Sequence, residues 1–466
     1  MGIFLHSCET PETVLEALAH MGITISTTAI NEAVRSLSKE SGAKMKDLGR
    51  SFLSLYAYDN LDLDLKHSMP TMEKPGDTLI HLTTGTMIPL HSTITLHDLN
   101  CCKELWEKSK LNRFAQSQNV PPTKIEHLLS IHPETDDHPS GLLRRDRFNA
   151  WKFLHDLVHF GPEYFRKFVK TLGHPEVIDE IPLEKTQQIP NRALDIAPST
   201  PSQNAEALEA FFRQAGIGDP NENPQSFDIG NSVVLVFGDL LTGERIRSLL
   251  ESRSEESTSW RRGQFIVYVM GLFHLKMACA DAIWRIFLQP KAARVDESCL
   301  MEHVGEIRPK ETGKIGSGPG FRTMHEVIQH VGIASRLDCW QLAANTEKPS
   351  CQSLEEFAKL KPTWEDIQAI ANKLALEKVA DAEMSARRAQ PDYRRDAHHE
   401  NILLRQKYFL LYEEISHGMN AGDIGRVETC LMPWAFIFQA CGKHKYAAEL
   451  IRYLENVHFV YPPGLK

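Results

Sequence analysis

The stretch SVVLVFGDLLTGERIRSLLESR, residues 232–253, decides the fold class of this chain. It begins with a run of β-branched and other apolar residues, breaks at Gly238-Asp239, and continues with the apolar spacing of a helix. A continuous apolar strand of this kind is typical of a parallel sheet that is buried on both faces. The stretch GQFIVYVMGLFHLKMACADAIWRIFL, residues 263–288, repeats the strand-to-helix order. Residues 231–288 therefore predict one βαβα unit.

An earlier strand is predicted in SLYAYDNLDLDLKH, residues 54–67, because apolar and polar residues alternate there. Strands disfavour Asp and Asn, so the four acid or amide residues in this run need an explanation. The alternation places Asn60, Asp62 and Asp64 on a polar side, where water can solvate them. Asp59 falls on the apolar side with the leucines, and the sequence therefore predicts that something compensates its charge.

Further elements are predicted on both sides of this strand. DTLIHLTTGTMIPLH, residues 77–91, indicates a second strand with a turn near Gly85 and an end at Pro89. Residues 10–48 predict a helical hairpin, with Thr10 as the first cap, Pro11 in the first turn, and Ser26 or Thr27 as the second cap. A DNA-binding helix-turn-helix is the alternative, but a plain hairpin is favoured because the second helix carries few basic residues, Arg35 and Lys39.

The rest of the chain predicts a mostly helical protein. Residues 101–170 and 289–466 show helical patterns, whereas the Pro-rich region 181–231 indicates loops around one helix. The breaks in the C-terminal part fall at Gly418 and Gly422, and EIRPKETGKIGSGPG indicates a loop. The predicted organisation is a hairpin at 1–50, an α/β core at 51–288 with a helical insertion at about 101–225, a second helical insertion at 289–395, and C-terminal helices at 396–466 that complete the core.

The composition excludes several classes of protein. The chain has 466 residues, of which 42% are hydrophobic, which is typical of a globular protein. Its net charge of -9 is unlike that of a dedicated nucleic-acid binder. Its nine cysteines form no CxxC pair, which argues against a zinc module or a disulfide framework. No apolar run is long enough to span a bilayer and no signal peptide is recognised, so we expect an intracellular, soluble protein.

Two carboxylates are the leading candidates for chemistry. If the strands that carry Asp59 and Asp239 are neighbours in one sheet, their carboxylates can face each other and hold Mg²⁺, which prefers oxygen ligands. The alternative, favoured by spacing alone, is that Asp59 caps a turn and Asp239 caps the helix that follows it. His274 is either a core histidine or an active-site contact, and the core is favoured. GSGPG (316–320) lacks the ending of a phosphate loop, and HHE (398–400) lacks the spacing of a zinc protease helix.

A resemblance adds to this interpretation. The blocks YDNLDLDLK, VFGDLLTGERIRSLLESRSEES, VMGLFHLKMACADAIW, FRTMHEVIQHVGIASRLDCW and NAGDIGRVETCLMPWAFIFQACGKHKYAAELI resemble a fungal domain family of unknown function that occurs in transposon-associated genes. More distantly, the chain is similar to the ribonuclease H-like DDE transposases of the hAT and Mutator-like type. In those proteins one acid lies on the first strand and a second lies just after the fourth strand. A third acid follows a helical insertion, on a C-terminal helix.

This resemblance implies a fold, a reaction and a site. The fold would be a ribonuclease H-like mixed sheet with a large helical insertion. Asp59 and Asp239 would be the first two acids, and His274 would lie in the block after the second. The third acid is open among Asp423, Glu413, Glu414 and Glu428, with Asp423 preferred because it opens a helix in the GDIGR block. These groups would hold Mg²⁺ or Mn²⁺ for cleavage or strand transfer of DNA, in the nucleus rather than the cytoplasm.

Two other functions compete with the nuclease hypothesis. The first is a catalytically inactive, domesticated scaffold or interaction protein, which the acidic net charge and the lack of a zinc-binding DNA module favour. The second is a DNA-binding regulator that uses the N-terminal hairpin. The oligomeric state is left open. Whether the protein is an enzyme at all therefore depends on how the acids are placed.

Overall fold

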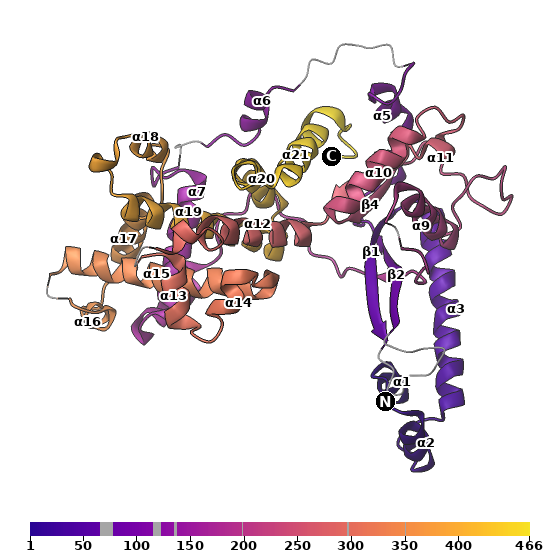
Figure 1. The fold of residues 1–466 in the computed structure, drawn as a ribbon, viewed down its shortest axis with the longest axis horizontal. Coiled ribbons are helices and arrows are strands. Elements are labelled where there is room, and N and C mark those ends of the chain that lie inside the picture. Colours follow the sequence, from indigo (N-terminus) through magenta and orange to yellow (C-terminus); the bar gives the residue numbers. More distant parts are fainter. Residues whose placement is uncertain (66–77, 115–122, 135–137, 198, 296–297, 350) are drawn as a thin grey trace. The chain divides into compact units, whose positions relative to one another are not determined.

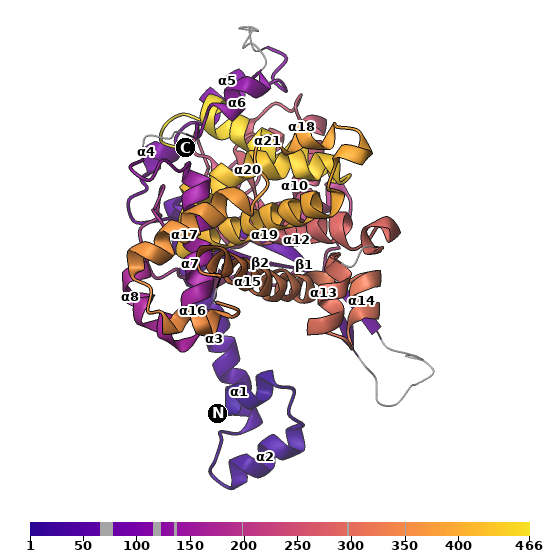
Figure 2. The same cartoon turned by 90° about the vertical axis from the view of Figure 1, so that its left-hand side faces the viewer.

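A computed structural model describes residues 1–65, 78–114, 123–134, 138–197, 199–295, 298–349 and 351–466 (Figures 1 and 2). Lys66 and His67, which end the predicted first strand, lie outside these ranges. The chain forms two compact units. The first unit comprises 1–121, 184–271 and 457–466, and the second comprises 122–183 and 272–456. Each unit is described separately.

The first unit contains a five-stranded mixed sheet, in the order β3-β2-β1-β4-β5. β1 pairs antiparallel with β2 along its whole length, β2 pairs antiparallel with β3, and β1, β4 and β5 run parallel. The protein is therefore of the mixed α/β class, as predicted. The strands are β1 (Ser54–Leu65), β2 (Thr78–Pro89), β3 (Ile189–Pro190), β4 (Val234–Gly238) and β5 (Ile266–Met270).

One face of this sheet packs on helices. Tyr56 and Tyr58 of β1 lie against Phe212 and Phe211, with ring centroids 5.1 and 5.8 Å apart. These phenylalanines come from α9 (Pro201–Gln214), the one helix predicted in the Pro-rich region. Each buried ring of this size contributes roughly 1.5–3 kcal/mol. The aromatic layer therefore fixes α9 on the sheet and is a large part of the core of the first unit.

The predicted turn at Gly85 is wrong, because β2 continues through this residue to Pro89. A Cβ at position 85 would lie 2.9 Å from the Phe211 ring. Glycine is therefore needed where the strand passes under the aromatic layer, and it does not mark a turn. The predicted end of the strand at Pro89 is confirmed.

The N-terminal helices differ from the prediction in their limits. The hairpin consists of α2 (Glu12–His20) and α3 (Thr27–Ser51), and a short α1 (Gly2–Ser7) precedes it. Ser26 caps α3 by accepting a hydrogen bond from the Ala29 N–H, as predicted. Pro11, rather than Thr10, occupies the capping position of α2 and makes no side-chain cap. The other helices of the first unit are α4 (Leu96–Leu99), α5 (Cys102–Lys108), α10 (Leu240–Ser252) and α11 (Ser259–Arg262).

The second unit is helical in the part of the chain that is described (Figure 2). Its core contains Phe153, Trp340 and Leu410, which are buried on three different helices. Those helices are α7 (Arg144–Phe160), α15 (Gly320–Glu347) and α19 (Ala397–Ala421). The others are α6 (Ile125–Leu129), η1 (Glu163–Phe168), α8 (Val169–Leu172), α12 (Leu272–Phe287), η2 (Lys291–Arg294), α13 (Leu300–Ile307), α14 (Thr312–Ser317), α16 (Leu354–Lys359), α17 (Trp364–Glu377), α18 (Met384–Arg388), η3 (Asp392–Arg394), α20 (Ile424–Ala440) and α21 (His444–Glu455). A short π-helical turn, Asn456–Val460, follows α21, and all of it except Asn456 belongs to the first unit.

Two predictions about glycine-rich segments fail in this unit. The segment predicted as a loop, EIRPKETGKIGSGPG, contains the end of α13 and all of α14. Gly418 does not break α19, which continues to Ala421. A Cβ on Gly418 would lie 3.1 Å from the Asp423 carbonyl oxygen and from Val427, so this glycine lets α19 and α20 approach closely. The predicted break at Gly422 is confirmed, since its φ of 76° makes it a left-handed helix cap.

No helix in the described ranges is both long enough and apolar enough to cross a membrane.

Candidate functional site

Asp59 lies in β1 and Asp239 directly after β4, near one edge of the sheet in the first unit. β1 and β4 are parallel neighbours, in the register Ala57 opposite Phe237. Asp239 therefore lies just after the carboxyl end of β4, and Asp59 lies beside it within β1, two residues after Ala57. After β1 the chain continues to β2, on one side of the β1–β4 pair. After β4 it continues to β5, on the other side of that pair. Open α/β sheets bind their ligands at such a switch point, outside the carboxyl ends of the strands.

The backbone holds Asp239 firmly. Its side chain is the N-cap of α10, and Oδ1 accepts a 2.7 Å hydrogen bond from the Thr242 N–H. Its carbonyl oxygen accepts a 2.6 Å hydrogen bond from the Tyr268 hydroxyl of β5. The helix can approach β5 this closely because position 243 is glycine, where a Cβ would overlap the Tyr268 ring. The predicted cap is therefore present, and the second carboxylate oxygen remains available for a ligand.

Asp59 is exposed, and its Oδ1 accepts a 2.8 Å hydrogen bond from the N–H of Asn60. The side of β1 on which the alternation places Asp59 with the leucines is therefore exposed at this residue. Leu61 and Leu63, which alternate with the acids, are 39% and 37% exposed. β4 pairs with β1 only before this point, and the part of β1 that follows pairs with β2. Water can therefore solvate the Asp59 carboxylate.

The Tyr58 hydroxyl and the Arg245 guanidinium, which the sequence patterns do not single out, also lie near this edge. The buried Tyr58 hydroxyl donates a 2.8 Å hydrogen bond to Oδ1 of Asn204. Burial raises the pKa of Tyr58 above its ordinary value, the charge of Asp239 raises it further, and the charge of Arg245 opposes this rise. A carboxylate and a guanidinium therefore both lie near this hydroxyl. Arg245 comes from α10 and is half-buried, so it adds a positive charge to the edge that carries the two acids.

The preferred third acid, Asp423, lies in the second unit and is almost completely buried. Oδ1 accepts hydrogen bonds from the N–H groups of Asp179 and Arg426, both 3.0 Å long. Oδ2 accepts from the Ile178 N–H and the Arg426 Nε, both at 3.2 Å. Burial by itself would raise the pKa of Asp423, but these backbone donors and the Arg426 charge hold it below its ordinary value. A carboxylate offers about four acceptor sites. These contacts therefore favour the helix cap over a metal ligand.

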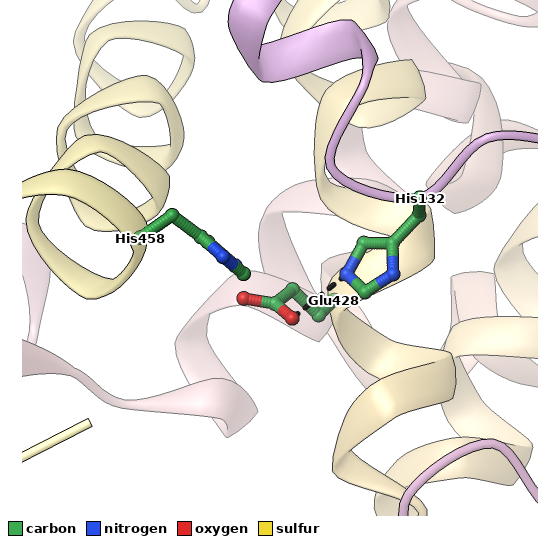
Figure 3. Close-up of side chains that lie close together, drawn as sticks. All are labelled: His132, Glu428 and His458. Carbon is green, nitrogen blue, oxygen red and sulfur yellow. Dashed lines mark hydrogen bonds and ion pairs between the residues drawn. The ribbon is translucent and has the colours of Figure 1, made fainter. Parts of the chain in front are cut away.

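The other three candidates for the third acid, Glu413, Glu414 and Glu428, also lie in the second unit. Glu413 is buried and bonds to Arg336, whereas Glu414 is buried and bonds to Arg145 and Arg426. Glu428 is less buried, with a side chain that is 15% exposed. Its Oε2 lies 2.8 Å from Nε2 of His132 (Figure 3). Figure 3 also draws His458, which belongs to the first unit.

His274 lies near the start of α12 in the second unit and is half-buried. Its ring centroid is 6.0 Å from that of Phe273, which is itself exposed. The His274 side chain is therefore partly exposed rather than fully buried. Of the four predicted site residues, the structure brings Asp59 and Asp239 together on neighbouring strands, whereas His274 and Asp423 belong to the other unit.

The donor chemistry of the first unit fits a hard cation only in part. Asp59 and Asp239 supply carboxylate oxygens, and Mg²⁺ is commonly held by one or two carboxylates with water in its other positions. Among the residues described in the first unit, no three carboxylate, imidazole or thiol groups place ligand atoms within 4.8 Å of one another. A hard cation at this edge would have two protein carboxylates as ligands, Asp59 and Asp239.

A comparison with protein-family models identifies the family. The model of DUF6589, a family of unknown function, matches residues 118–466, which is most of the chain. The chain belongs to this family. The predicted membership of a family of unknown function is thereby confirmed. Asp239, His274 and Asp423 lie inside the matched region of this DUF6589 protein, and Asp59 lies before it. Comparisons with curated proteins and with solved structures gave no match.

Proposed function

We propose that this DUF6589 protein is derived from a transposase and that its first unit is a ribonuclease H-like core. In this proposal the core uses Mg²⁺ or Mn²⁺ to cleave or transfer phosphodiester bonds of DNA. The observation that carries it is the position of two acids. Asp59 lies on the first strand of the sheet, and Asp239 follows the fourth strand directly. The two strands are parallel neighbours, as the resemblance requires of the first two acids of such a site.

The surrounding groups support a phosphate-binding role for this edge. Metal ions bound to paired carboxylates activate an attacking oxygen and stabilise the leaving oxygen in phosphoryl transfer. The Asp59 and Asp239 carboxylates would hold such ions, and the Asp239 cap would keep one of them in place. The Arg245 guanidinium would pair with a phosphate of the DNA, because guanidinium and phosphate match in charge and geometry.

The test is a Mg²⁺- or Mn²⁺-dependent nicking assay on supercoiled DNA. Asp239→Asn is the sharpest variant, because Asn caps a helix as well as Asp does but carries no charge. Asp59→Asn removes the other carboxylate, and Asp64→Asn is the control, since it removes an exposed acid from the same strand. We expect nicking to fall on the order of 100-fold for Asp239→Asn and Asp59→Asn, and to remain unchanged for Asp64→Asn.

The resemblance also expects a third acid, which the same assay can identify. Asp423→Asn and Glu428→Gln are compared, with circular dichroism as a check of folding. If Asp423 is only a helix cap, its variant loses stability but keeps its rate per folded molecule. A loss of rate in the Glu428 variant alone would assign the third acid to Glu428.

The alternative function is a catalytically inactive scaffold. The helix cap made by Asp239 and the solvation of Asp59 favour it, because both acids then have a role or an environment that needs no metal. Nicking that is equal in wild type and Asp239→Asn, or absent from wild type with both metals, would refute the nuclease proposal and leave the scaffold.

A further inference from the structure

A cavity of about 320 Å³ lies in the second unit, lined by α12, by the start of α15 and by residues at the start of α21. Its walls are mostly apolar and include three aromatic rings and two methionines: Trp284, Phe321, Tyr446, Met277 and Met324. Ligand cavities in proteins are typically about 300–1,000 Å³ in volume and combine apolar walls with a few polar groups. This cavity therefore has the size and composition of a site for a small molecule.

The glycine-rich turn before α15 forms one side of the cavity. Gly318, Pro319 and Gly320 line it, and they end the GSGPG motif. Both glycines are exposed, and a Cβ at either position would meet no atom of the described residues within 4 Å. Gly320 has a φ of 71°, in the left-handed region that favours glycine. The glycines therefore leave room for a ligand beside the backbone on this side of the cavity.

A nearly buried ammonium is the main hydrogen-bond donor of the cavity. The Lys443 side chain is 13% exposed, and its Nζ lies 2.8 Å from Oδ2 of Asp281, which also lines the cavity. A lysine ammonium has three donors. Throughout the described ranges, Asp281 is the only hydrogen-bond or ion-pair acceptor found for this ammonium. Lys443 can therefore donate to a ligand in the cavity as well as to Asp281.

The charges around Asp281 favour a ligand that brings a negative charge. Asp281 also accepts a 2.7 Å hydrogen bond from Nε of Arg285, so one carboxylate faces two cations. Burial by itself would raise the pKa of Asp281, but its contacts with Lys443 and Arg285 hold it below its ordinary value. The Asp281 carboxylate is therefore ionised at neutral pH, and the three groups together carry one positive charge.

A cationic ligand is disfavoured for a second reason. The Lys443 ammonium lies over the Tyr446 ring, 5.1 Å from its centroid. The face of an aromatic ring attracts a cation, and here the chain's own ammonium already occupies that position. A second cation in the cavity would be repelled by this ammonium.

The walls of the cavity favour a flat aromatic ligand. The indole N–H of Trp284 donates a 2.8 Å hydrogen bond to the Ile315 carbonyl oxygen. Tryptophan has no other polar side-chain group, so the rest of this ring offers only apolar contacts to the cavity. Phe321, Met277 and Met324 add an aromatic ring and two polarizable sulfur atoms, which pack favourably against aromatic rings.

We propose that this cavity binds a planar aromatic molecule that carries one carboxylate. The ring of the ligand lies among Trp284, Phe321 and the two methionines, and its carboxylate accepts a hydrogen bond from the Lys443 ammonium. A charge-assisted hydrogen bond of this kind is about twice as strong as a neutral one. The site uses none of the acids of the proposed nuclease, so it does not depend on that proposal.

Calorimetry of the full chain with 2-naphthoate and its uncharged analogue 2-naphthamide tests this proposal. Wild type should bind 2-naphthoate at least about tenfold more tightly than 2-naphthamide, because only the carboxylate forms the charge-assisted hydrogen bond. Lys443→Met removes the charge and should bind both compounds with the same affinity. Met277→Trp fills the cavity and should bind neither compound. Lys445→Met is the matched control, since it removes an exposed lysine from the same helix, and it should behave like wild type.

The proposal is overturned if wild type binds neither compound or binds both equally, or if Lys443→Met keeps the preference for 2-naphthoate. Circular dichroism shows whether the variants fold. Phe321→Leu is a smaller change at a half-buried ring and should weaken the binding of both compounds by about fivefold. It locates the site if Met277→Trp does not fold, and unchanged affinity in Phe321→Leu would also count against the cavity.

Discussion

Replacement of Arg336 by Leu tests how the second unit tolerates charge in its core. The Arg336 side chain is completely buried on α15. Its Nε donates to Asp156 at 2.5 Å and its Nη2 donates to Glu413 at 2.9 Å. Lys152 lies 2.6 Å from Asp156 and 3.9 Å from Glu413. Two carboxylates are thus balanced by two cations, and the variant leaves one buried negative charge without a partner.

We expect Arg336→Leu to destabilise the second unit by about 3–5 kcal/mol at pH 8, the usual cost of breaking a buried ion pair. The loss should depend on pH. In wild type, the pKa of Asp156 is lower in the folded state than in the unfolded chain, where it is about 3.9. The stabilisation that ionised Asp156 adds to the free energy of unfolding is therefore fully present above about pH 3.9 and is lost only at lower pH. In the variant, burial without the guanidinium raises the pKa of the remaining carboxylates, so they take up protons as the pH falls. The difference from wild type should shrink between pH 8 and pH 5 by roughly 1 kcal/mol or more.

Hydrogen–deuterium exchange of the α7, α15 and α19 amides, corrected for intrinsic rates at each pH, measures this opening in the second unit alone. The control is Arg285→Leu, which removes an exposed arginine that pairs with Asp281 one turn away. Such surface pairs contribute about 0.5 kcal/mol or less. If Arg336→Leu behaved like this control at pH 8, or if its effect grew as the pH fell, the account of the buried charges would be refuted.

Three further substitutions have definite expected outcomes. Gly243→Ala should destabilise the first unit by roughly 1–3 kcal/mol, because the new Cβ overlaps the Tyr268 ring; faster exchange of the α10 amides would show it. Tyr58→Phe should cost about 1–3 kcal/mol in urea denaturation, since it removes the buried hydrogen bond to Asn204. Asp423→Ala should cost roughly 3 kcal/mol, measured by exchange at the start of α20, because buried donors lose their acceptor. An unchanged exchange rate or denaturation midpoint in any of them would contradict the contact concerned.

Local sequence patterns predicted the elements correctly where one signal dominated. The β-branched run before Gly238 gave β4, and Asp239 was predicted as the cap of the helix that follows. The alternation after Ser54 gave β1, and Ser26 was predicted as a cap of α3. In each case the signal lies within a few residues of the element, because caps and strand periodicity are local properties.

Glycines and acids were predicted less well, because their roles depend on partners far away in the sequence. Gly85 was predicted to turn the chain, but it is needed under Phe211 of α9. The choice among the third acids could not be made from spacing, since Glu413 finds its partner 77 residues away in Arg336.

The sequence by itself determined the mixed α/β class, the strand-to-helix order around Asp239 and the presence of an acid-rich strand at 54–65. Only the tertiary structure decided that β1 and β4 are parallel neighbours, which places Asp59 and Asp239 at one edge of the sheet. It also decided that Asp59 is exposed, on the part of β1 that lies beyond its pairing with β4. Alternation specifies the two sides of a strand, whereas burial of a side requires another element to cover it, and that depends on contacts between segments distant in the chain.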